Sequence, residues 1–150
     1  MNRPFALLDG VQSGPLPANC ESNSSTLSST AQAAQATGPD SLIIAIARLG
    51  NGEHRRELNL RRLHNVRVFL TDFAKRPVET VITAEGKPTT GFGRVELYVS
   101  AKLFDVIAVK KNGDLLVSLT CEPDEIRPKW ADRNLYPYLD RKPRKPATKP

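Results

Sequence analysis

The dipeptide Asn112-Gly113 constrains the fold of this chain more than any other feature of its sequence. It lies between two runs rich in β-forming residues, LFDVIAVKK and DLLVSLTC. A two-residue type I′ turn prefers Asn-Gly, because both of its central residues need a positive φ. The sequence therefore predicts strands near 103–111 and 114–121 that pair in an antiparallel hairpin.

Two further alternating runs precede this hairpin. In GRVELYVS, residues 93–100, Val95, Leu97 and Val99 alternate with polar or aromatic side chains, as in a half-buried strand. VETVITAE, residues 78–85, is separated from that run by a loop with glycine and proline at 86–91, which is typical of a second hairpin. Because only residues 100–102 separate the two hairpins, we expect an antiparallel meander.

The core begins with SLIIAIARL, residues 41–49, a nearly continuous apolar run bounded by turn residues. Its length and isoleucine content favour a buried strand over a helix. GNGE, residues 50–53, is turn sequence, because glycine and asparagine tolerate positive φ. HRRELNL, residues 54–60, is predicted to return as the hairpin partner of this strand.

Residues 59–77 fit a helix better than a strand. Asn59 suits the start of a helix, and Pro77 its end. The run NVRVFL also alternates as a strand would, so both interpretations remain open. The apolar residues with helical spacing are Leu60, Leu63, Val66, Leu70 and Phe73.

These elements predict an α+β fold, mainly β, with a small antiparallel sheet of five to six strands and one helix. Residues 1–40 are rich in Ser, Thr, Ala and Gln and poor in large apolar residues, so we expect a disordered N-terminal arm. Residues 124–150 are basic and rich in proline, so we expect an extended tail. The globular domain is then expected to span residues 41–123.

The net charge of +6 lies in the expected domain and tail. Residues 41–123 hold 13 basic and 9 acidic side chains, and residues 124–150 hold 8 basic and 4 acidic ones. Such a balance favours a polyanionic partner through attraction to phosphates, although many soluble proteins are equally basic.

Neither cysteine has neighbours spaced as metal ligands. Cys20 lies in the expected arm, and Cys121 ends an apolar run. The simplest interpretation is two free thiols in a reducing compartment. The N-terminus is too weakly apolar for a secretory signal, and no apolar run approaches the length of a membrane span. We therefore expect a cytoplasmic protein without membrane contact.

Residues 90–97, TGFGRVEL, resemble the octapeptide on the third strand of RNA-recognition-motif domains. That resemblance would place Phe92 at a base-stacking position, but Arg94 and Leu97 stand where the family has aromatic residues. The family also needs a helix after this strand, whereas Asn112-Gly113 predicts a hairpin, so the chain is not assigned to it.

VETVITAEGKPTTGFGRVELYVS is similar to the first hairpin of single-stranded-DNA-binding proteins of the OB-fold type. The aromatic-rich third strand of those proteins has no counterpart in VIAVKKNGDLLV, which lacks Trp, Tyr and Phe. Neither resemblance therefore assigns a family.

The side of strand 93–99 that faces away from the core is the first candidate binding surface. Phe92, Arg94 and Tyr98 would stand there, and rings beside an arginine can stack bases, at about 1–3 kcal/mol per base. The alternative is that the rings pack beneath the arm, the helix or a partner.

Two basic groups complete the candidate nucleic-acid site. Residues of the predicted helix would stand away from its apolar face and contact phosphates, or form only a solvated face: Arg61, Arg62 and Arg67. Residues of the tail would attract phosphates in a salt-sensitive way: Arg141, Lys142, Arg144 and Lys145.

The sequence therefore predicts a small non-enzymatic protein that binds nucleic acid, with single-stranded DNA or RNA as its partner. The alternative is a protein-interaction or assembly module, such as a viral structural component or a small inhibitor, whose exposed strand edges promote self-association. His54 and His64 have no nucleophile or carboxylate at a recognisable catalytic spacing, and no metal or cofactor motif is present. We expect no catalytic residue and no cofactor.

Overall fold

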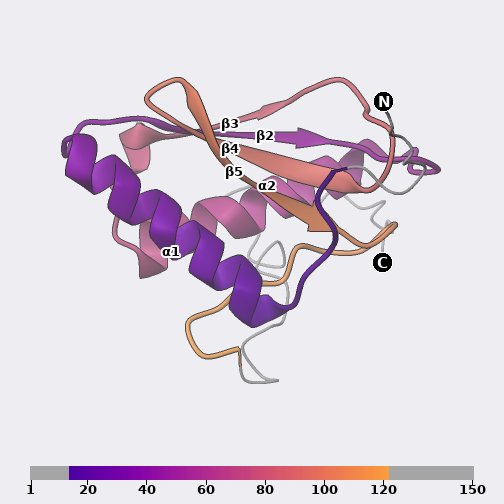
Figure 1. Ribbon diagram of the computed structural model, residues 1–150, viewed down its shortest axis with the longest axis horizontal. Coiled ribbons are helices and arrows are strands. Elements are labelled where there is room, and N and C mark those ends of the chain that lie inside the picture. Colours follow the sequence, from indigo (N-terminus) through magenta and orange to yellow (C-terminus); the bar gives the residue numbers. More distant parts are fainter. Residues whose placement is uncertain (1–13, 122–150) are drawn as a thin grey trace, which may run out of the picture.

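The computed structural model describes residues 14–121 of the 150-residue chain. These residues form a four-stranded sheet with the strand order β3-β2-β4-β5, and two α-helices pack on one of its faces (Figure 1). The elements in chain order are α1 (Cys20–Thr37), β2 (Ile43–Arg48), α2 (Arg56–Val68), β3 (Val81–Glu85), β4 (Gly93–Val99) and β5 (Lys102–Val109). The predicted α+β class is confirmed. The predicted count of five to six strands and one helix is wrong for the described residues.

Strand β2 lies inside the sheet because its sequence, IIAIAR, is apolar on both sides. It pairs antiparallel with β4, where Ile43 faces Val99, and parallel with β3, where Ile43 faces Val81. A parallel pair needs a long crossover connection, which α2 supplies. The predicted hairpin between residues 41–49 and 54–60 is therefore wrong, and the sheet is mixed.

The helical interpretation of residues 59–77 is confirmed, although the helix begins earlier. Its N-cap is Arg55, so Asn59 lies inside α2 and does not cap it. The helix continues as a wider π-helical turn, Phe69–Phe73, and Lys75 then takes a positive φ of 62° before Pro77. Three of the predicted apolar residues are buried against the sheet: Leu63, Val66 and Leu70.

The predicted hairpin between residues 78–85 and 93–100 is wrong, because β2 lies between β3 and β4. The antiparallel contact between β4 and the next strand is present, and residues Ser100 and Ala101 connect the two. Both have positive φ, 51° and 71°, which is the twist that a tight hairpin turn needs. A bulge leaves Phe104 without a partner, because Leu97 faces Asp105 while Tyr98 faces Leu103.

A turn forms near Asn112, but it is not the predicted type I′ turn, because only Asn112 of the pair Asn112-Gly113 has a positive φ. The strand predicted after it does not form either. Asn112 has a φ of 59°, and the N–H of Gly113 donates to the carbonyl of Lys110. The segment that follows lies between the two helices, where side-chain amides replace a strand partner: Asn23 donates to the carbonyl of Leu116, and Asn65 to that of Leu115. The hairpin of residues 103–111 with 114–121 is therefore wrong.

The expected disordered arm contains a helix, α1. Asn19 caps it, because its side chain accepts from the N–H of Ser22, and Gly38 ends it with a bond to the carbonyl of Ala34. Leu27 is fully buried, and the small side chains of Ala31 and Ala34 are buried beside it, so this helix packs close to the sheet. The folded unit therefore begins before residue 41. Residues 1–13 and 122–150, and with them the expected tail, lie outside the described residues.

Cys20 and Cys121 form a disulfide, so the expectation of two free thiols is wrong. The bond joins the first residue of α1 to the end of the segment between the helices. The two cysteines are 101 residues apart in the sequence, and no local spacing predicts such a pair.

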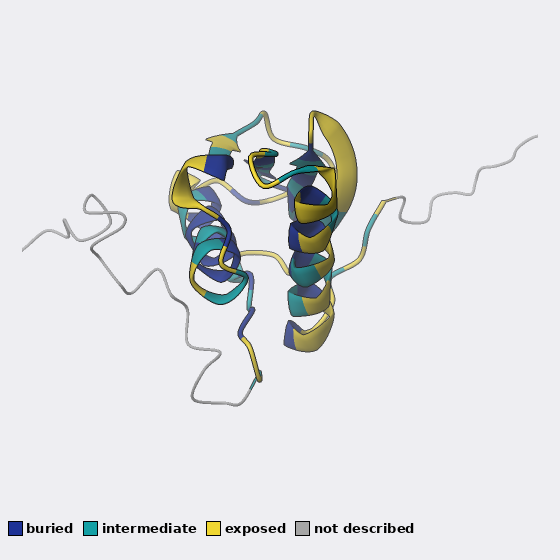
Figure 2. Cartoon of the chain, turned by 90° about the vertical axis from the view of Figure 1, so that its left-hand side faces the viewer, coloured by how far each residue is buried: buried dark blue, intermediate teal, exposed yellow. Residues whose placement is uncertain are grey.

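The core lies between the helices and one face of the sheet. Leu27 of α1, Leu63 of α2 and Leu97 of β4 belong to one cluster of buried apolar residues. Figure 2 shows both helices on the same side of the strands. The opposite face of the sheet carries no helix of the described chain.

Candidate binding surfaces

The face of the sheet without helices, called the open face below, is largely apolar. Strand register places its side chains in rows that cross all four strands. Leu103 is 56% exposed and Ile82 is 42% exposed. Exposed apolar area of this kind marks interaction surfaces in many proteins. The open face comprises the row Ile82, Ile44, Tyr98 and Leu103, and the row Ala84, Ile46, Glu96 and Val106.

One polar network crosses the middle of the open face. Nε of Arg48 donates to one carboxylate oxygen of Glu96 at 3.0 Å, and the hydroxyl of Tyr98 donates to the other at 3.0 Å. The bond to Glu96 raises the pKa of Tyr98 above its ordinary value. Because Arg48 compensates Glu96, the centre of the face has no excess positive charge to attract phosphates.

The predicted residues of strand 93–99 point away from the core as expected, but they do not form one surface. Arg94 turns back over its own loop, where its guanidinium donates to the carbonyls of Thr90 and Phe92. Phe92 lies in that loop and is 38% exposed. Tyr98 lies four residues farther along β4, a distance of about 14 Å. The structure therefore brings Phe92 and Arg94 together and leaves Tyr98 apart.

The three predicted arginines of α2 do not share a surface either. Arg62 is fully buried, so the prediction that it stands away from the apolar face is wrong. Nη1 of Arg67 donates to the carbonyl of Val81 at 2.9 Å, and Arg61 is half-buried. The four basic residues of the tail, Arg141, Lys142, Arg144 and Lys145, lie outside the described residues.

Arg62 is buried because it pairs with Glu53, a residue that sequence reasoning did not single out. Its two terminal nitrogens donate to the two carboxylate oxygens of Glu53 at 3.0 and 2.6 Å, and its Nε donates to the carbonyl of Gly113. The backbone N–H groups of Gly50 and Asn112 donate one further hydrogen bond each to the carboxylate of Glu53. Burial alone would raise the pKa of Glu53, but the hydrogen bonds from Arg62, Gly50 and Asn112 lower it to about 2.

The Glu53–Arg62 pair joins α2 to the loops at Gly50–Glu53 and Asn112–Gly113, at one end of the sheet. A Cβ at Gly93 would overlap the carboxylate of Glu53 and the guanidinium of Arg62. A Cβ at Gly50 would overlap the main chain at Gly93. The sequence signal was the turn GNGE, which predicts a loop but not a buried acid. Arg62 has the sequence pattern of an ordinary residue on a helix surface. Its burial follows only when Glu53 and the distant loop at Asn112–Gly113 lie against it.

A hollow of about 250 Å³ opens at this loop end. The residues that line it include Glu53, Phe92 and Lys111. Lys111 also lies close above Gly52. The hollow therefore combines an exposed ring with a cation, and its buried carboxylate is already satisfied by four hydrogen bonds.

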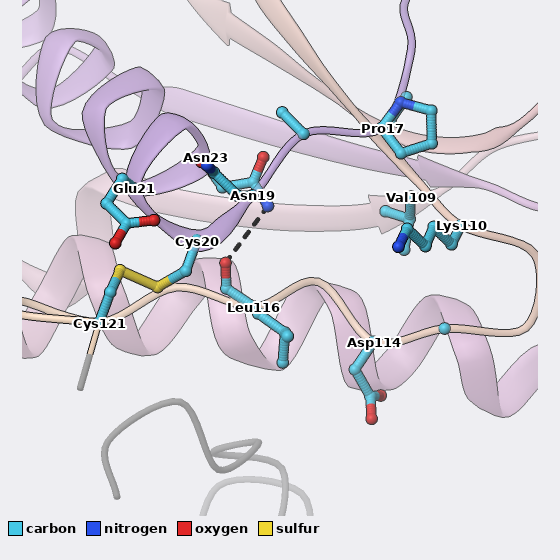
Figure 3. Close-up of a pocket in the computed structure, with 13 residues that line it drawn as sticks. Pro17, Asn19, Cys20, Glu21, Asn23, Val109, Lys110, Asp114, Leu116 and Cys121 are labelled. Atoms are coloured by element: carbon cyan, nitrogen blue, oxygen red, sulfur yellow. Dashed lines mark hydrogen bonds between the residues drawn. A yellow bond between two sulfur atoms is a disulfide. The ribbon is translucent and has the colours of Figure 1, made fainter. Parts of the chain in front are cut away.

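A larger hollow, about 490 Å³, lies between the start of α1, the end of β5 and the segment that follows β5 (Figure 3). The Cys20–Cys121 disulfide lies at one end of it, and Val109 and Lys110 lie at the other. Asn23 spans the gap beside the disulfide with its bond to the carbonyl of Leu116 at 3.2 Å. This bond and the disulfide fix the width of the hollow.

Residues 14–121 contain no group of three or more His, Cys, Asp or Glu side chains placed to hold a metal ion. Neither helix of the described segment is long and apolar enough to cross a membrane. No family model, no curated protein and no solved structure matches the chain.

Proposed function

We propose that this chain is a non-enzymatic binding module that holds a segment of a partner protein on the open face of its sheet. The observation that carries the proposal is the exposure of Ile82 and Leu103 on a face without helices. Interfaces commonly combine an apolar centre with a few polar groups that fix orientation. Here the network of Arg48, Glu96 and Tyr98 supplies such groups beside the apolar rows.

The disulfide bears on where this binding occurs. Disulfides persist in oxidising compartments and are rare in the cytoplasm. The expectation of a cytoplasmic protein rested in part on two free thiols, and Cys20 and Cys121 are paired. The disulfide therefore supports an oxidising compartment for the proposed binding module.

Nucleic-acid binding is the second candidate, and it is favoured by the loop end rather than by the open face. Phe92 is an exposed ring beside a hollow that Lys111 also lines. A base stacked on that ring would lie next to a cation, which is how many single-strand binders combine stacking with charge. The net charge of +6 supports the same candidate.

Selection of peptides from a displayed random library on the immobilised, oxidised full chain tests the first candidate. Selected peptides would be labelled, and their affinities measured by fluorescence anisotropy for the wild type and for Ile82→Glu and Leu103→Glu. We expect either substitution to weaken binding at least tenfold, which corresponds to about 1.4 kcal/mol. Labelled single-stranded DNA and RNA would be measured in parallel at low and high salt.

Leu119→Glu is the matched control, because Leu119 is also exposed but follows the segment between the helices. It should leave peptide binding unchanged. Peptides that bind both sheet variants as well as the wild type would contradict the first candidate. Oligonucleotide binding that is lost in Phe92→Ala or Lys111→Ala would support the second.

A further inference from the structure

The described chain begins beside one end of the open face. A Cβ built on Gly14 would lie 3.8 Å from Nη2 of Arg94. Ala108 faces Arg94 across the strands and is 3% exposed, and it lines the same hollow as Pro17 and Ala18. Figure 1 shows the segment before α1 rising from that helix toward the strands. Residues 14–18 therefore reach the rim of the open face at its Arg94 end.

A segment that five residues separate from Gly14 is suited to an apolar surface. Residues 4–8 have the sequence PFALL, which contains Phe5, Leu7 and Leu8, and no charged residue. These three large apolar side chains can bury area against an apolar surface. The charged groups in the middle of the open face, Arg48 and Glu96, are already paired, so an uncharged apolar segment leaves no charge unmatched.

The length of the segment matches the distance it must cover. Leu8 lies six residues before Gly14 and can reach about 20 Å from it when the chain is extended. Tyr98 is about 14 Å along β4 from Arg94, and β3 lies two strands away from β4, at about 10 Å. Residues 4–8 can therefore reach the exposed row that contains Ile82, Tyr98 and Leu103.

The other end of the chain fits this face less well. Residues 122–150 follow Cys121, whose disulfide fixes it to the start of α1 on the helix side of the sheet. Most residues of that segment are charged residues or prolines, and it has 8 basic side chains from residue 124 onward. It would bring unpaired charge to an apolar surface, which is unfavourable.

We propose that residues 4–8 dock on the open face over Ile82, Tyr98 and Leu103 and compete there with the partner segment. Only the competition rests on the proposed function, since the intramolecular docking needs no partner. Docking of this kind raises the apparent Kd of the partner, which equals the intrinsic Kd divided by the fraction of molecules in which the face is uncovered. The module is then open to partners strong enough to displace its own N-terminal segment.

Photo-crosslinking of the full oxidised chain tests the docking directly. A benzophenone amino acid would replace Leu103, and in a control protein it would replace the equally exposed Leu119. Cleavage before Asp9 releases residues 1–8, so mass spectrometry identifies a crosslink to them. We expect position 103 to crosslink to residues 1–8 within one molecule, independently of protein concentration, and position 119 not to do so.

Two matched variants make the result specific. The pair Leu7→Asp and Leu8→Asp should abolish the crosslink and tighten the binding of selected peptides. The pair Gln12→Asp and Ser13→Asp adds the same charge outside the apolar run and should leave the crosslink in place. A crosslink from position 103 to residues 122–150 or to a second copy, or no crosslink to residues 1–8, would overturn the inference.

The two proposals fail in different ways. Peptides selected on the open face without any crosslink to residues 1–8 would overturn the docking inference and leave the proposed function standing. A crosslink to residues 1–8, with no peptide selected even on the Leu7→Asp and Leu8→Asp variant, would overturn the proposed function alone.

Discussion

Removal of the disulfide between Cys20 and Cys121 is predicted to destabilise the fold severely. The two residues are 101 positions apart, and a loop of that length gives about 4.7 kcal/mol at 25 °C from the entropy lost by the unfolded chain. The free energy of unfolding of a single domain is about 5–15 kcal/mol in total. Leu27 is the largest apolar side chain that α1 buries, so this helix has few other contacts to hold it when the bond is gone.

Urea unfolding of the oxidised wild type and of the double variant Cys20→Ser and Cys121→Ser measures this loss. We expect the free energy of unfolding to fall by about 3–5 kcal/mol in the variant. Reductant should shift the wild type toward the variant and should leave the variant unchanged. A loss below about 1 kcal/mol would show that the packing of α1, rather than the covalent link, holds the two segments, and the reasoning would fail.

The remaining predictions concern the Glu53–Arg62 pair. Arg62→Met leaves a buried carboxylate without its partner and should lower the free energy of unfolding by about 3–5 kcal/mol, whereas adding Glu53→Leu should recover much of that loss, as urea titrations of the two proteins would show. Glu53 has a pKa of about 2 in the fold against 4.5 in the unfolded chain, so its stabilisation is present above about pH 5 and is lost as the pH falls toward 2. Glu53→Gln should flatten that part of a stability–pH curve, and an unchanged slope would contradict the assignment. Gly93→Ala should destabilise the fold because its methyl group overlaps both charged side chains, and a thermal midpoint within 1 °C of the wild type would speak against that crowding.

The elements with their own periodic pattern could be predicted from the sequence. The alternation in residues 93–99 correctly separates Val95, Leu97 and Val99, which are buried, from Arg94 and the other residues of the outer side. The helical spacing of residues 60–73 correctly predicts α2. In both cases the side chains themselves carry the information, because one face of each element is buried in the core.

Strand pairing could not be predicted in the same way. The sequence IIAIAR indicates a buried strand, but its pattern is the same whether its neighbour returns directly or after a helix. A turn is present near Asn112, although it is not of type I′, and the next segment is held by the side-chain amides of Asn23 and Asn65, which come from two distant helices. The residue types of a turn do not predict which distant side chains will hold the segment after it.

The candidate site shows the same limit. Phe92, Arg94 and Tyr98 point outward, as the alternation predicts, but Tyr98 lies four residues along β4 from Arg94, and Arg94 folds back onto the loop before β4. Arg62 was predicted to be exposed because an arginine on a helix usually is. Its burial depends on Glu53, whose carboxylate accepts from Gly50 in its own loop and from Asn112 in a distant loop. The direction of a side chain on its own strand could thus be predicted from the sequence. A partner that comes from a distant part of the chain could not.

The measurement that tests the central claim most directly is amide chemical-shift mapping of the isotope-labelled full chain, titrated with a peptide selected on it. The account predicts the largest shifts on the open face, at Ile44, Ile82, Tyr98 and Val106, with saturation at the Kd obtained by anisotropy. Shifts confined to Asn51, Gly91 and Lys111 at the loop end, or shifts produced by oligonucleotides but by no peptide, would contradict it.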